Sequence, residues 1–151
     1  MKTFMHSVAV LGLCFTVSTN IFAGDKEDAL AALNKGISAF NSKEYQTYLT
    51  YIADDYEAFT GVGTPLLHMG KPAWAAFISG LGQLPSVSYQ QQQNTVRVYN
   101  GNTSLINGYF VFTVVGKDGS ATTQSGRVTT AMVKQDGKWL LVSSHFSPMF
   151  L

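Results

Sequence analysis

The second half of the chain consists of four long β-type runs, and this pattern restricts the fold more than any other feature of the sequence. The runs cover residues 87–99, 103–115, 121–134 and 138–147, and short turns rich in Gly, Asn and Asp separate them. Turns of this length connect neighbouring antiparallel strands. The second half is therefore predicted to be a four-stranded antiparallel meander.

Three amphipathic helices are predicted before the meander. They cover residues 25–41, 43–52 and 72–81, and each places apolar side chains on one face. Two short strand-like segments, residues 56–61 and 66–70, lie between the second and third helices. Helices followed by a strand meander are typical of an α+β fold in which the helices cover one face of an antiparallel sheet.

The N-terminus has the pattern of a secretory signal peptide, predicted for residues 1–23. Lys2 precedes an apolar run at residues 8–17, which is too short to span a bilayer as a helix. The small residue Ala23 offers a cleavage site, and we expect cleavage after Ala23 or Gly24. The chain is then predicted to be bacterial, periplasmic or secreted, with one domain over residues 25–151.

Composition excludes several classes of function. The net charge is +1 and charged residues are 13%, so no basic surface for nucleic acid or for anionic lipid is expected. The only cysteine, Cys14, lies in the predicted signal, so the mature domain has no thiol. His68 and His145 do not show the ligand spacing of a metal site. The sequence therefore predicts neither a cofactor nor a metal centre.

The last hairpin, residues 126–147, can pair in either of two registers. A two-residue turn places Gln135 opposite Lys138, whereas a three-residue loop with a glycine bulge places Lys134 opposite Lys138. A shift of one residue changes which side chains face each other. We favour the three-residue loop, because polarity then rises steadily along one face from the turn to the open end.

The favoured register predicts a candidate ligand site. It places Arg127 opposite His145 with Thr129 on the same face, and an arginine among apolar neighbours needs an anionic partner. Asn107 and Tyr109 of the preceding strand are expected to share this face. A pocket between sheet and helices would also be lined by three aromatic residues and a loop histidine: Tyr48, Tyr56, Trp74 and His68.

Two functions are compatible with this predicted pocket. The first is binding of a small, partly apolar ligand that is anionic or bears a carbonyl group, held near Arg127. The second is a lyase or isomerase reaction with His145 as general base and Arg127 stabilising an enolate-like oxygen. A third, weaker hypothesis is a dimerisation module with a vestigial pocket. A closed aromatic cavity without a titrating pair would favour binding or a vestigial pocket.

The opposite face of the predicted sheet is also apolar. Three short helices can cover only one face, and an uncovered apolar face of this size normally contacts a partner. The simplest partner is a second copy of the chain across a two-fold axis. The residues expected at this homodimer interface are Ile106, Phe110, Phe112, Met132, Leu140 and Val142.

Several short motifs resemble the SnoaL-like domains of the nuclear transport factor 2-like superfamily. They are Gly126-Arg127-x-Thr129, Asp136-Gly137-Lys138-Trp139 and His145-x-Ser147, with Asp54-Asp55-Tyr56, Gly70-Lys71 and Phe77 upstream. They are also similar to the association domain of calcium/calmodulin-dependent protein kinase II. The resemblance implies a cone-shaped, strongly curved sheet wrapped on the helices, a pocket at its open end and usually a dimer. Enzymes and pure binding modules share this fold.

Overall fold

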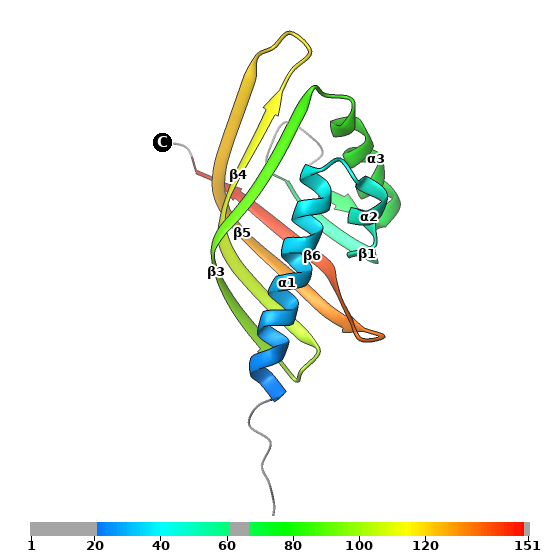
Figure 1. The fold of residues 1–151 in the computed structure, drawn as a ribbon, viewed down its shortest axis with the longest axis vertical. Coiled ribbons are helices and arrows are strands. Elements are labelled where there is room, and N and C mark those ends of the chain that lie inside the picture. The colour runs from blue at the N-terminus through cyan, green and yellow to red at the C-terminus, as the bar shows by residue number, and fades with distance from the viewer. Residues whose placement is uncertain (1–20, 61–66, 150–151) are drawn as a thin grey trace, which may run out of the picture.

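The computed structural model describes residues 21–60 and 67–149, so most of the predicted signal peptide lies outside the described residues. The helices are α1 (Ile21–Asn41), α2 (Tyr45–Leu49) and α3 (Gly70–Gly82). The strands are β1 (Ile52–Phe59), β2 (Leu67–Met69), β3 (Ser86–Tyr99), β4 (Thr103–Val115), β5 (Ala121–Gln135) and β6 (Lys138–Pro148). Figure 1 shows one curved sheet with the helices on its concave side, which confirms the predicted α+β fold.

The sheet has six strands in the order β2-β1-β6-β5-β4-β3. The meander from β3 to β6 is antiparallel, as predicted. However, β1 runs parallel to β6, so the sheet is mixed and not purely antiparallel. The second helix is also shorter than predicted, because α2 ends at Leu49 and the chain enters β1 at Ile52. The first strand, β1, therefore lies beside the last strand, β6, inside the sheet.

The predicted three-residue loop of the last hairpin is wrong. Gln135 pairs with Lys138 across a two-residue turn. Both turn residues have positive φ, 49° at Asp136 and 76° at Gly137. A two-residue hairpin turn whose twist matches that of the strands requires positive φ at both central residues. Asp and Gly adopt positive φ more readily than most residues, so Asp-Gly is suited to this turn.

A bulge further along the same hairpin changes the register again. The pairing of β5 with β6 shifts between Ala131 and Met132, so one extra residue of β6 is inserted there. Beyond this bulge Thr129, and not Arg127, lies opposite His145. The predicted pairing of Arg127 with His145 is therefore wrong, because the turn and the bulge each move β6 by one residue relative to β5.

Local irregularities bend the long strands around α1. In β3 the register with β4 shifts between Gln92 and Thr95, and Gln93 has a φ of 54°. Gly108 of β4 lies beside this bulge, where the side-chain oxygen of Asn94 occupies the space that a Cβ would need. Bulges and glycines at such positions increase strand twist and curvature. The curvature creates the hollow in which the helices lie.

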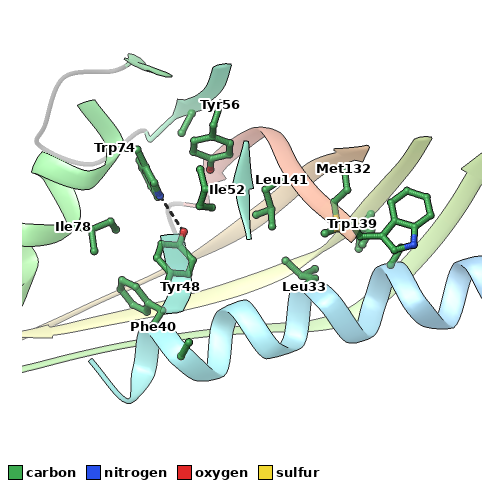
Figure 2. Packing of buried hydrophobic residues seen from close by; sticks show 14 of the residues in the cluster. Leu33, Phe40, Tyr48, Ile52, Tyr56, Trp74, Ile78, Met132, Trp139 and Leu141 are labelled. Atoms are coloured by element: carbon green, nitrogen blue, oxygen red, sulfur yellow. Dashed lines mark hydrogen bonds between the residues drawn. The ribbon is translucent and has the colours of Figure 1, made fainter. Parts of the chain in front are cut away.

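The core is the contact between α1 and the concave face of the sheet. Ala29, Leu33 and Phe40 recur at intervals of four and seven residues on α1 and are at most 6% exposed. Figure 2 shows Leu33 and Phe40 directed toward the sheet residue Leu141 and toward Tyr48. Complete burial of each such side chain stabilises the fold by about 1.5–3 kcal/mol. This contact fixes which face of the sheet is internal.

The faces of β4 and β5 are the reverse of the prediction, whereas Leu140 of β6, also predicted for the dimer interface, faces away from the helices between the buried Trp139 and Leu141. Ile106, Phe110 and Met132, predicted for a dimer interface, face the helices and are at most 2% exposed. The face directed away from the helices is here called the outer face. It carries all of the exposed large hydrophobic side chains among the described residues: Phe59, Leu67, Met69, Tyr99 and Tyr109. No helix within residues 21–60 and 67–149 is long and apolar enough to cross a membrane.

Candidate ligand-binding site

A cavity of about 260 Å³ lies between the concave face of the sheet and the three helices. All three helices and strands β1 and β3–β6 contribute to its walls. An apolar cavity of about 150 Å³ is large enough to hold benzene. By that measure this cavity has room for a ligand of about two fused rings.

The cavity is apolar and uncharged. Within the described part of the chain, its lining contains no Asp, Glu, Lys, Arg or His. Its polar groups are side-chain hydroxyls and amides, from Tyr48, Tyr56, Thr60, Tyr89, Gln91, Gln124, Thr130 and Ser144. Likewise, no group of three potential metal ligands from His, Cys, Asp and Glu was found among residues 21–60 and 67–149.

Tyr48, Tyr56 and Trp74 form the wall nearest α2 and α3. The indole Nε1–H of Trp74 donates a hydrogen bond of 3.0 Å to the hydroxyl oxygen of Tyr48, shown as a dashed line in Figure 2. The rings of Tyr56 and Trp74 meet edge to face at 5.2 Å. Burial raises the pKa of both tyrosines well above the usual value. Both phenols therefore stay protonated and act as neutral hydrogen-bonding groups.

Three aromatic rings on the sheet form the opposite wall of the cavity. Phe110 and Phe146 meet edge to face with centroids 5.4 Å apart, and Tyr89 lies 6.3 Å from Phe110 and 6.0 Å from Phe146. These side chains come from three different strands, β3, β4 and β6. The bend of the sheet brings their rings together and turns them toward the helices.

Asn41 at the end of α1 holds β3 in position. Its side-chain amide donates to the backbone carbonyl of Tyr89 and accepts from the Tyr89 backbone N–H, both at 2.8 Å. The Tyr89 hydroxyl donates to Oε1 of Gln91 at 2.9 Å, and Nε2 of Gln91 donates to Asn94 at 2.9 Å. The two bonds from Asn41 also satisfy the backbone N–H and carbonyl of Tyr89 on the edge strand β3.

His68 lies behind the helix-side wall and does not line the cavity. The short strand predicted for residues 66–70 is confirmed as β2, and His68, expected at the pocket wall, lies in this strand and is 6% exposed. Its ring is 4.5 Å from the Phe77 ring and 5.5 Å from the Trp74 ring. Its Nε2 has no hydrogen-bond partner among the described residues. Desolvation by burial lowers the pKa of His68, so the neutral imidazole is favoured.

Three of the nine predicted site residues line the cavity: Tyr48, Tyr56 and Trp74. They could be found because they fall on apolar faces of helical or strand-like segments. The sequence did not identify the sheet residues of the opposite wall. Phe110 and Phe112 were assigned to a dimer interface. Gln91, in the glutamine run of β3, was not predicted to face the cavity.

The other predicted sheet residues lie on the outer face. Arg127, Thr129 and His145 are exposed, as is Tyr109, which lies opposite Arg127. Thr129 donates a hydrogen bond of 2.8 Å to Asn107 on the same face. Placing these five in the cavity was wrong, because both faces of the sheet are apolar enough for the sequence pattern to fit either orientation. An exposed Arg127 can be solvated and needs no buried anion.

With this geometry in place, comparison with known proteins identifies the family. Residues 29–151 match the SnoaL-like domain family. The chain belongs to the SnoaL-like domain family. No curated protein matched the chain.

Solved structures of the nuclear transport factor 2-like fold are similar to this SnoaL-like domain. The association domain of C. elegans CaMKII is 16% identical with a TM-score of 0.66, covering 83% of this chain and 96% of that one. A candidate dehydratase of the NTF2-like family from Streptomyces avermitilis is 16% identical with a TM-score of 0.75, covering 85% and 99%. A candidate aromatic ring hydroxylase from Novosphingobium aromaticivorans is 17% identical with a TM-score of 0.77, covering 85% and 92%. At these identities the comparison establishes the fold alone.

The burial of His68 predicts that the SnoaL-like domain loses stability in mild acid. The pKa of His68 is below 6.5 in the folded state, so the unfolded chain binds more protons as the pH falls through 6.5. The free energy of unfolding should decrease over that range and level off below the folded pKa. A His68→Phe variant, which keeps a ring against Trp74 and Phe77, should reduce this pH dependence.

The measurement is chemical denaturation at several pH values from about 7.5 down to about 5. His145→Gln, on the exposed outer face, is the matched control and should retain the pH dependence, because His68 is still present. An unchanged pH dependence in His68→Phe would show that another group causes it.

Proposed function

We propose that this SnoaL-like domain binds a small, uncharged, largely apolar molecule in the cavity between sheet and helices. The supporting observation is the lining, which combines aromatic and aliphatic side chains with neutral hydroxyl and amide groups. A charged ligand would lose its hydration there without gaining an oppositely charged partner from the described lining. An apolar ligand gains about 25 cal/mol for each Å² of surface removed from water. This replaces the ligand expected near Arg127, which was anionic or bore a carbonyl group.

Binding without chemistry is the function that the described lining supports best. The reaction predicted from the sequence needed His145 as general base, but His145 lies on the outer face. Tyr48, Tyr56 and Tyr89 hold their protons more tightly than usual, because burial raises the pKa of each. A group that keeps its proton at neutral pH is a poor general base. These tyrosines are suited to orient a ligand.

Naphthalene should therefore bind this domain, and naphthalene-2-carboxylate should bind at least about tenfold more weakly, because its charge would be desolvated in the cavity. Isothermal titration calorimetry at neutral pH measures both affinities. Native mass spectrometry of protein purified from its own host would reveal a retained natural ligand. Tighter binding of the carboxylate would contradict an uncharged site.

Two neighbouring substitutions locate the binding in the cavity. Val114 lines the cavity, so Val114→Trp should fill it and abolish naphthalene binding. Val115 is the next residue of β4 and alternates to the outer face. Val115→Trp adds the same ring and should leave binding unchanged. Loss of binding in both variants would place the ligand elsewhere or indicate a general loss of folding, which circular dichroism distinguishes.

We also propose that the domain forms a homodimer through the outer face. Five large hydrophobic side chains are exposed on this face, and Met69 is 66% exposed. Contiguous exposed apolar side chains normally mark an interaction surface, and Phe59 and Leu67 are cross-strand partners on β1 and β2. The similarity to a kinase association domain also supports self-association. The proposed interface replaces the inward-facing residues predicted from the sequence, while the reason for expecting a dimer is unchanged.

A Tyr109→Asp variant should weaken this dimer by about 30-fold or more, because it introduces a charge where an aromatic side chain would be buried. Sedimentation velocity over a concentration series measures the dissociation constant. Ser38→Asp, on the exposed side of α1, is the matched control and should leave the constant unchanged. A monomeric wild-type protein at all concentrations would rule out the proposal.

We further propose that residues 1–23 are a secretory signal and that the domain works in the periplasm or outside the cell. The signal pattern before Ala23 supports this proposal, and the position of Asp25 is compatible with cleavage just before it. Asp25 is 7% exposed and accepts a hydrogen bond of 2.8 Å from Nζ of Lys134. Cleavage after Ala23 or Gly24 keeps this ion pair between α1 and β5.

Expression of the whole chain in a Gram-negative host should yield periplasmic protein whose first residue is Gly24 or Asp25, because the signal pattern ends there. N-terminal sequencing and intact mass measurement of the periplasmic fraction identify the first residue. Lys2→Glu, which removes the positive charge before the apolar run, should reduce export. Full-length protein confined to the cytoplasm would contradict the proposal.

A further inference from the structure

Five buried side-chain atoms have no hydrogen-bond partner within the described residues, and only one of them belongs to the cavity. They are Oη of Tyr45, Nε2 of His68, Oγ of Ser104, Oε1 of Gln124 and Nε1 of Trp139. Gln124 alone among these residues lines the cavity. A buried carbonyl oxygen without a partner is unfavourable, so each such atom in a folded protein requires an explanation.

Gln124 is placed by β5 at the sheet side of the cavity. It pairs with Phe112 of β4, whose side chain also lines the cavity. Its neighbours along β5 alternate to the outer face, so the strand directs the Gln124 side chain toward the helices. The amide therefore lies among aromatic and aliphatic groups, with its Oε1 shielded from solvent.

A second glutamine in the cavity shows what a purely structural amide looks like. Oε1 of Gln91 accepts from the Tyr89 hydroxyl, and its Nε2 donates to Asn94. These contacts hold Tyr89 against the bulge of β3. The Oε1 of Gln124 has no equivalent partner among the described residues. Both amides lie in the same cavity, but of the two only Gln124 has an Oε1 that is not already accepting a hydrogen bond from a described residue.

We infer that Oε1 of Gln124 accepts a hydrogen bond from the ligand, and that the ligand is a neutral aromatic ring system carrying a hydroxyl or N–H group. This inference rests on the binding function proposed above and adds the ligand's polar group. The apolar walls receive the rings. Among the described lining residues, Oε1 of Gln124 is the buried side-chain atom without a hydrogen-bond partner, so a ligand group that donates to it also removes the cost of leaving it unpaired.

The test compares three ligands of nearly equal size: naphthalene, 2-naphthol and 2-methoxynaphthalene. Calorimetric titration of the wild-type protein should show that 2-naphthol binds about tenfold more tightly than the other two, because only 2-naphthol can donate to Gln124. In Gln124→Leu the three ligands should bind within about twofold of one another. Naphthalene binding retained by this variant would show that the cavity is intact.

Gln92→Leu is the matched control, since Gln92 is an exposed glutamine of β3, and it should keep the preference for 2-naphthol. Equal binding of all three ligands to the wild type would overturn the inference and leave the apolar binding function standing. A preference for 2-methoxynaphthalene would overturn it too, by showing that the amide presents its N–H groups. Failure of all three to bind would refute the proposed function itself.

Discussion

The bend of the sheet is the constraint on which the rest of this SnoaL-like domain depends. A flat sheet would pack directly against three helices and leave no internal space. Here the bulges in β3 and β6 and the glycine at position 108 curve the strands. The helix α1 packs against the sheet, and the cavity lies where α2 and α3 face the concave side of the sheet. Close packing along α1 and the cavity are thus two consequences of one curvature.

The same geometry keeps charged groups out of the described lining of the cavity. Aromatic rings and neutral hydroxyls line the concave side, where burial keeps the tyrosines protonated. Arg127 and His145 lie on the outer face, where water solvates them. The proposed ligand would be selected by shape and by a few neutral hydrogen bonds. Its outer face, with polar groups among exposed hydrophobic side chains, is better suited to contact another protein surface.

Much of the fold could be predicted, and three of the nine predicted site residues line the cavity. Helix periodicity identified Tyr48 and Trp74, and strand alternation correctly separated Arg127 and Thr129 from Met132 on opposite sides of β5. The prediction of which side of β5 faces the helices was wrong, because both sides contain enough apolar residues to be internal. In β6 the assignment of residues to the two sides was also wrong beyond the bulge, because the inserted residue reverses the alternation there.

The sequence by itself determined the order of helices and strands, the turns between them and the family, because these depend on local periodicity and short motifs. Only the tertiary structure decided which face of the sheet became the interior. That choice follows from the long-range packing of α1 on the concave face, together with a bulge that local patterns do not reveal. Since side chains alternate along a strand, one such decision moves every candidate site residue to the inside or the outside at once.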